Sequence, residues 1–66
     1  MQIRNFTEIE LDYFRKWCNF TKDEMEYLNL KAKGNSNIQI SLAMNVSESQ
    51  VSKLARRVKN KIIRVI

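Results

Sequence analysis

The sequence has no histidine and no proline, and it has one cysteine and one glycine among its 66 residues. Without histidine and with a single thiol, it cannot form a Ser-His-Asp triad, an imidazole or thiolate metal site, or an internal disulfide. No apolar run approaches the roughly 20 residues of a membrane span. The N-terminus is already charged at Arg4, so we expect no signal peptide. We therefore expect a cytoplasmic protein that is not an enzyme and that uses no metal and no cofactor.

The basic residues are concentrated in one part of the sequence. The sequence has twelve Lys and Arg residues and seven Asp and Glu residues, which gives a net charge of +5. Residues 1–48 hold six basic and seven acidic side chains, whereas residues 49–66 hold six basic and none acidic. Such a segment indicates an anionic partner, and nucleic acid is the first candidate. The length fits one domain, so we expect residues 1–66 to form a single domain.

The sequence contains residues typical of helix N-termini and C-termini. Four Ser or Thr residues are followed three positions later by Glu or Gln, which is the capping box. The pairs are Thr7 with Glu10, Thr21 with Glu24, Ser36 with Gln39, and Ser47 with Gln50. Gly34 and Asn45 tolerate the left-handed backbone that ends a helix. The sequence therefore predicts an all-α domain of four helices, at about residues 8–18, 22–33, 37–44 and 48–64.

The spacing of apolar residues predicts which face of each helix turns inward. The expected core residues are Ile9, Tyr13, Phe14, Trp17 and Cys18 in the first helix, Met25, Tyr27, Leu28, Leu30 and Ala32 in the second, and Val51, Leu54, Ala55, Val58, Ile62 and Val65 in the last. In the third, Ile38, Ile40, Leu42 and Met44 alternate as in a strand. The segment is short and capped, so we expect a helix that is buried on several sides.

The third and fourth predicted helices fit a helix-turn-helix. This motif needs a small residue where the helices touch, a residue that tolerates a left-handed turn, and apolar anchors on both helices. Ser41 is the small residue, Asn45 stands at the turn, and Val51 and Leu54 anchor the second helix. The motif predicts that the first half of the fourth helix enters the major groove of DNA.

A wider pattern covers residues 20–62 without a gap. It consists of Phe20-Thr21, Glu24, Glu26, Leu28, Leu30, Ala32, Gly34, Ser36-Asn37, Ile40, Met44, Val46-Ser47, Val51, Val58 and Lys61-Ile62. The pattern resembles the DNA-binding domain of LuxR-type response regulators, including its stand-alone spore-regulator form, and region 4 of sigma factors shares much of it. Ser41, Ser52 and Leu54 depart from the Ala, Lys and His that are usual there. The resemblance implies a further helix after the recognition helix, often used for dimerisation. This sequence instead has an extra predicted helix before the domain, so the dimer geometry does not carry over.

The outward face of the fourth helix supplies the candidate DNA contacts. Candidates for base contacts are Ser49, Gln50, Ser52, Lys53 and Arg56, and the resemblance implies such contacts at Ser52, Lys53 and Arg56. Lys53 and Arg56 can donate to guanine, and Gln50 can pair with adenine although its capping role competes. Candidates for phosphate contacts are Arg57, Lys59 and Asn60, together with Ser36, Asn37 and Ser47 at helix N-termini.

Three functions follow from these features. The leading hypothesis is sequence-specific binding of double-stranded DNA by a small bacterial or phage transcription regulator. A homodimer is expected because one helix-turn-helix reads few base pairs. The alternative is an interaction module that docks on RNA polymerase or another regulator, with Trp17 and Phe14 as its surface. Attachment to a membrane surface through the basic, apolar C-terminal tail is not favoured, because packing is a simpler use of that tail.

Overall fold

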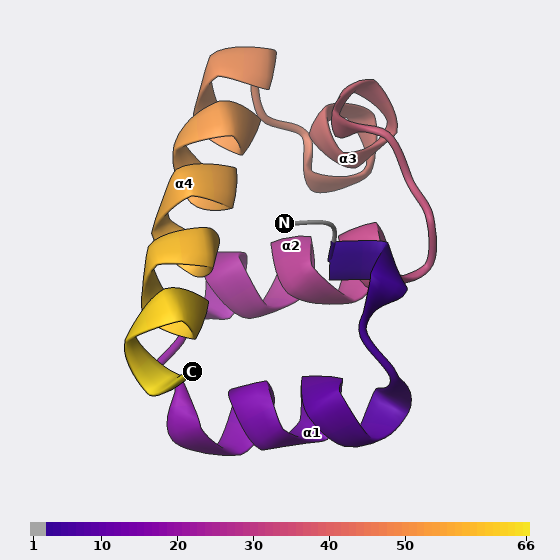
Figure 1. The fold of residues 1–66 in the computed structure, drawn as a ribbon. Coiled ribbons are helices and arrows are strands. Elements are labelled where there is room, and N and C mark those ends of the chain that lie inside the picture. Colours follow the sequence, from indigo (N-terminus) through magenta and orange to yellow (C-terminus); the bar gives the residue numbers. More distant parts are fainter. Residues whose placement is uncertain (1–2) are drawn as a thin grey trace.

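The computed structural model describes residues 3–66, and these form an all-α fold (Figure 1). A short 3-10 turn, η1 (Ile3–Asn5), precedes four helices: α1 (Glu8–Trp17), α2 (Lys22–Ala32), α3 (Asn37–Met44) and α4 (Glu48–Val65). The predicted fold class is confirmed, and each helix begins and ends within one residue of its expected bounds. No feature of the sequence predicts η1, since a single 3-10 turn has neither a cap nor a periodic pattern.

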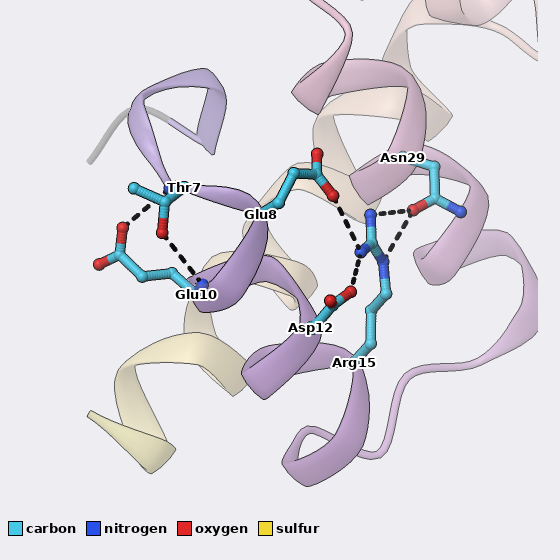
Figure 2. A network of polar contacts seen from close by, with 6 residues as sticks. All are labelled: Thr7, Glu8, Glu10, Asp12, Arg15 and Asn29. Atoms are coloured by element: carbon cyan, nitrogen blue, oxygen red, sulfur yellow. Dashed lines mark hydrogen bonds and ion pairs between the residues drawn. The ribbon is translucent and has the colours of Figure 1, made fainter.

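Reciprocal capping boxes open three of the four helices. At the start of α1, the Thr7 N–H donates to Glu10 Oε1 at 2.9 Å, and the Glu10 N–H donates to Thr7 Oγ1 at 3.2 Å (Figure 2). Thr21 with Glu24 and Ser36 with Gln39 form the same pair of bonds at the starts of α2 and α3. At α4 the box is only half formed: Ser47 Oγ accepts from the Gln50 N–H at 3.2 Å, and no bond returns from the Gln50 side chain. The predicted fourth box is therefore wrong in its second half.

Left-handed residues end α2 and α3, as expected. Gly34 has a φ of 95° and Asn45 a φ of 57°. Past Asn45, the Val46 N–H donates to the Ser41 carbonyl at 3.0 Å, and an equivalent bond follows Gly34. This is the Schellman pattern, which turns the chain sharply while keeping the last carbonyls bonded. In Figure 1, α3 is seen nearly end-on while α4 runs upright, so the two helices cross steeply in a helix-turn-helix.

A single apolar core holds the helices together. Its buried side chains are Ile3, Leu11, Phe14, Cys18, Tyr27, Leu28, Ile40, Val51, Leu54, Val58 and Ile62. The predicted inward face of α4 is confirmed, because four of its six residues are buried and Ala55 and Val65 are partly buried against them. The unpredicted contributions are Leu11 on α1 and Ile3, which η1 inserts against α2.

The predicted inward face of α1 is wrong in part. Phe14 and Cys18 are buried, but Ile9, Tyr13 and Trp17 are 82%, 48% and 59% exposed. The helix carries two apolar stripes, and the one that faces the core consists of Leu11, Phe14 and Cys18. This stripe is chosen because Phe14 meets the ring of Phe6 edge-on at 4.9 Å, while Cys18 Sγ lies 3.4 Å from the Lys61 carbonyl oxygen.

A polar network also fixes the rotation of α1 against α2. Arg15 donates from Nε and Nη2 to Asn29 Oδ1 on α2, at 3.1 and 2.9 Å. Its Nη1 donates to Asp12 Oδ1 at 2.7 Å and lies 3.9 Å from Glu8 Oε2 (Figure 2). With Arg15 held on the side of α2, the stripe of Ile9, Tyr13 and Trp17 turns away from the core.

The expectation that α3 is buried on several sides is also wrong. Ile40 and Ser41 face the core, and Met44 is partly buried. Ile38 and Leu42, on the opposite side of the helix, are 59% and 76% exposed. α3 packs on α2 and α4 with one face only, and no other described element covers its far side. Its apolar residues therefore divide between the core and the surface.

Candidate nucleic-acid interface

The outward face of α4 is open and carries uncompensated positive charge. Every predicted base-contacting residue is exposed: Ser49, Gln50, Ser52, Lys53 and Arg56. Of the predicted phosphate contacts on this helix, Arg57 and Asn60 are exposed and Lys59 is half-buried. Within residues 3–66, none of the four cations at positions 53, 56, 57 and 59 forms an ion pair. Their charge is free to meet an external anion.

A groove of about 520 Å³ joins the N-terminus of α3 to the middle of α4. Its lining residues are Asn37, Ser52, Ala55, Arg56, Lys59, Asn60 and Ile63. The structure therefore brings together predicted base and phosphate contacts from two helices on one concave surface. Lys53 and Arg57 do not line this groove, because they lie on the other flank of α4.

The N-terminus of α3 can bind an anion with the help of Lys31, which was not among the predicted contacts. Lys31 Nζ, from α2, donates to Asn37 Oδ1 at 3.2 Å. The carbonyl of the Asn37 side chain is thus occupied, and its NH₂ group remains as a donor beside the groove. Ser36 is exposed, but its hydroxyl caps the Gln39 N–H. The available signal for Lys31 was its place in the last turn of α2, which indicated only a favourable helix dipole.

The N-terminus of α4 differs from the others because its capping box is half formed. Ser47 is exposed and its hydroxyl is used as the cap. The Gln50 side chain has no hydrogen-bond partner among residues 3–66, so the expected competition between capping and base reading does not arise. Its amide can offer a donor and an acceptor together, which is the pattern that adenine presents.

An ion pair between a buried carboxylate and a half-buried lysine sets the position of α4. Lys61 donates to the Glu24 carboxylate on α2, and to the Asn19 carbonyl at 2.8 Å. Burial raises the pKa of Glu24, but hydrogen bonds from Lys61 and from the Thr21 N–H lower it by more, so it lies below its ordinary 4.5. Lys61 is therefore occupied inside the fold, and the charge presented by α4 comes from its other cations. The sequence indicated for Glu24 only a role as a capping-box residue.

The remaining chemistry of the described chain is limited. No group of three or more Cys, Asp or Glu side chains among residues 3–66 is arranged to hold a metal ion. None of the described helices has the length and apolarity needed to cross a membrane. Cys18 is buried as expected, and this burial raises the pKa of its thiol despite the nearby Lys61 charge.

Comparison of the sequence with known protein families gives a match. The family described as bacterial regulatory proteins, luxR family, matches residues 18–63. No curated protein and no solved structure matches the chain significantly. The matched residues contain α2, α3 and most of α4, so α1 lies outside them. Domains of this family are DNA-binding regulatory domains and not enzymes. The chain therefore belongs to the LuxR family of bacterial regulatory proteins, and it is a helix-turn-helix DNA-binding protein that regulates transcription.

Proposed function

We propose that the protein binds double-stranded DNA sequence-specifically, as a small bacterial or phage transcription regulator in the cytoplasm. The first half of α4 enters the major groove, where Lys53 and Arg56 donate to guanine and Gln50 contacts adenine. The observation that carries the proposal is the groove between α3 and α4. Both Asn37, whose side-chain oxygen accepts from Lys31 Nζ, and Arg56, which forms no ion pair within residues 3–66, line this groove.

The phosphate contacts follow from the same arrangement. The DNA backbone passes the N-terminus of α3, where the Asn37 amide and the Lys31 ammonium meet a phosphate. Ser36 and Ser47 take part through the free main-chain amides that follow them, since their hydroxyls are used as caps. On α4, Arg57, Lys59 and Asn60 extend the phosphate contacts, and Ser49 and Ser52 add short polar contacts to base edges.

We further propose that residues 1–66 act as one DNA-binding domain with α1 as an addition, and that two copies bind together. A single helix-turn-helix contacts too few base pairs to select one site in a genome. Two copies related by a two-fold axis read two half-sites, so the preference for the whole site is about the product of the preferences for its halves. Selection of bound duplexes from a random pool tests this proposal, and we expect a palindromic consensus.

The test of the interface itself is a set of single substitutions measured on the selected duplex. Lys53→Ala and Arg56→Ala are each expected to weaken binding by about 1–3 kcal/mol and to relax base choice at one position. Lys22→Ala removes the same charge from an exposed site on α2, away from the groove, and serves as the matched control. If all three variants bind every duplex as the wild type does, α4 is not the reading helix.

A second candidate function is docking on RNA polymerase or another regulator. The exposed Ile38 and Leu42 on α3 favour it, because they form an apolar surface beside the DNA-facing groove without belonging to it. Absence of duplex binding beyond the nonspecific level at physiological salt, for every sequence in the random pool, would favour this function over DNA reading.

A further inference from the structure

An exposed apolar stripe runs along the outward side of α1. Ile9, Tyr13 and Trp17 are spaced four residues apart, so they stand in one row on the helix surface, and we name them the α1 stripe. Aromatic residues of this kind are enriched in protein interfaces and depleted from free surfaces. The stripe lies on the helix that the family match leaves out, so the helix-turn-helix does not account for it.

The C-terminal end of α4 extends the α1 stripe into a wider apolar surface. A groove of about 390 Å³ is lined by Ile9, Glu10, Tyr13, Phe14, Val65 and Ile66. Ile66 is itself 80% exposed. In Figure 1, α1 lies at the end of the molecule opposite to α3 and the first turns of α4. A partner seated on this surface leaves the proposed DNA-reading face open.

We propose that a second copy of the chain docks here, with the two α1 helices antiparallel about a two-fold axis near Tyr13. The inference deepens the proposed homodimer, and rests on it, by naming its surface. Around such an axis Tyr13 faces its own copy, and Ile9 of each chain faces Trp17 of the other. The contact is isologous and closes on itself, so it yields a dimer and not a filament.

The charges on α1 favour this orientation. Glu8, Asp12 and Arg15 pair with one another on the side of α2, so the charges of α1 outside this network are Glu10 in its first turn and Lys16 in its last turn. Antiparallel pairing about position 13 sets Glu10 of each helix level with Lys16 of the other, whereas parallel pairing sets each of these charges level with its own copy. The helix dipoles also oppose one another only in the antiparallel arrangement. The chain is thus complementary to a copy of itself.

The size of the surface sets the strength of the dimer. Covering Ile9, Tyr13, Trp17 and Ile66 on both chains removes on the order of 1,000 Å² from water, at the lower end of specific interfaces. The dimer is therefore weak in free solution, and its population rises with protein concentration. Binding of both copies to one duplex then adds to its stability.

Sedimentation equilibrium of the full chain, from low micromolar to near-millimolar concentration, tests the proposal. The wild type is expected to shift from monomer to dimer, and Trp17→Glu is expected to stay monomeric. Leu42→Glu, which places the same charge on the exposed face of α3, is the matched control and should dimerise as the wild type does. Far-UV circular dichroism confirms that each variant is folded. A wild type that stays monomeric overturns the proposal and leaves the α1 stripe to a different protein, and a monomeric Leu42→Glu variant assigns the dimer to α3.

Disulfide cross-linking tests the orientation. Tyr13→Cys is expected to give a covalent dimer on mild oxidation, because the axis sets position 13 against itself. Ile9→Cys alone is expected not to, since its two copies stand eight residues apart along the helices, about 12 Å. Mixing the Ile9→Cys and Trp17→Cys chains should restore cross-linking. Cys18 is buried and is present in every variant, so oxidation of the wild type measures the background level of cross-linking. Self-cross-linking of Ile9→Cys would mean parallel helices and would overturn the proposal.

The outcome for the dimer is separable from that for DNA binding. Lys53→Ala is expected to weaken duplex binding without changing sedimentation, because Lys53 lies on α4 and outside the groove beside α1. Trp17→Glu is expected to retain binding to one half-site and to lose the advantage of a palindromic duplex. Monomeric wild type with binding that depends on Lys53 overturns the dimer alone.

Discussion

The substitution Glu24→Gln isolates the charge of one buried carboxylate. Gln is also a capping-box residue, so its side-chain oxygen can still accept from the Thr21 N–H. What the substitution removes is the ion pair with Lys61, which joins the start of α2 to the last turns of α4. The local helix start is thus preserved while the link between the two helices is weakened.

The size of the effect follows from the exposure of the two partners. Glu24 is 2% exposed, whereas the side chain of Lys61 is 26% exposed. Breaking a fully buried pair costs about 3–5 kcal/mol, because one charge is left without a partner. Lys61 reaches water and can still donate to the Asn19 carbonyl, so we expect a loss of about 1–2 kcal/mol in the free energy of unfolding. In a domain of this size, the melting temperature falls by roughly 5–15 °C.

The same pair predicts a dependence on pH. The pKa of Glu24 is lower in the folded protein than its ordinary value of 4.5, so the unfolded chain binds the proton more tightly. The stabilisation is complete above that ordinary value and is lost as the pH falls through the folded pKa. The difference in stability between the wild type and Glu24→Gln is therefore expected to shrink in acid.

The assay is urea denaturation followed by far-UV circular dichroism at neutral pH and at several acidic values. Glu26→Gln removes the same charge from an exposed position on α2 and should change stability by less than about 0.5 kcal/mol. Equal stabilities of Glu24→Gln and Glu26→Gln at neutral pH, or a difference that stays constant in acid, would refute the role assigned to the pair.

Three further predictions concern single features of the fold. In Gly34→Ala the added Cβ meets no atom within 4 Å, but the alanine must adopt a φ of 95°. The free energy of unfolding, measured by urea titration, should therefore fall by about 1–2 kcal/mol from backbone strain alone. Gln50→Ala should leave the thermal midpoint unchanged while weakening duplex binding, whereas Gln39→Ala, which removes half of a complete box, should lower the midpoint. Acrylamide should quench Trp17 fluorescence readily in dilute solution, although less than that of free indole because the side chain is 59% exposed, and strong protection there would mean that Trp17 is covered in the monomer.

The features that the sequence predicted are those that depend on interactions between residues close together in the chain. The starts of α1 to α4 follow from side chains that bond to main-chain groups three residues away, and the ends of α2 and α3 follow from Gly34 and Asn45. The inward face of α4 was also predictable, because only one of its faces is apolar. The candidate base contacts followed from that face, since the outward side is what remains.

The features that the sequence did not predict depend on contacts between distant residues. α1 has two apolar stripes of similar strength, and the choice between them is made by Asn29 and Lys61, which lie on other helices. In the same way, the Lys31 contact to Asn37 exists only because the turn after α2 folds back. The periodicity of apolar residues predicts neither of these contacts, because it indicates the faces of a helix and not the elements that pack against them.

The separation of charge along the chain has a kinetic consequence. Cations that form no ion pair within the described part of the chain lie on the outward face of α4, and acidic residues lie in the first turns of α1 and α2. The molecule measures 29 Å along its longest axis, several times the screening length of about 8 Å at physiological salt. In dilute salt the field of a duplex spans the whole molecule and exerts a torque on it, turning α4 toward the phosphates before contact. The association rate should therefore fall steeply as salt is added, because fewer encounters then begin in the productive orientation.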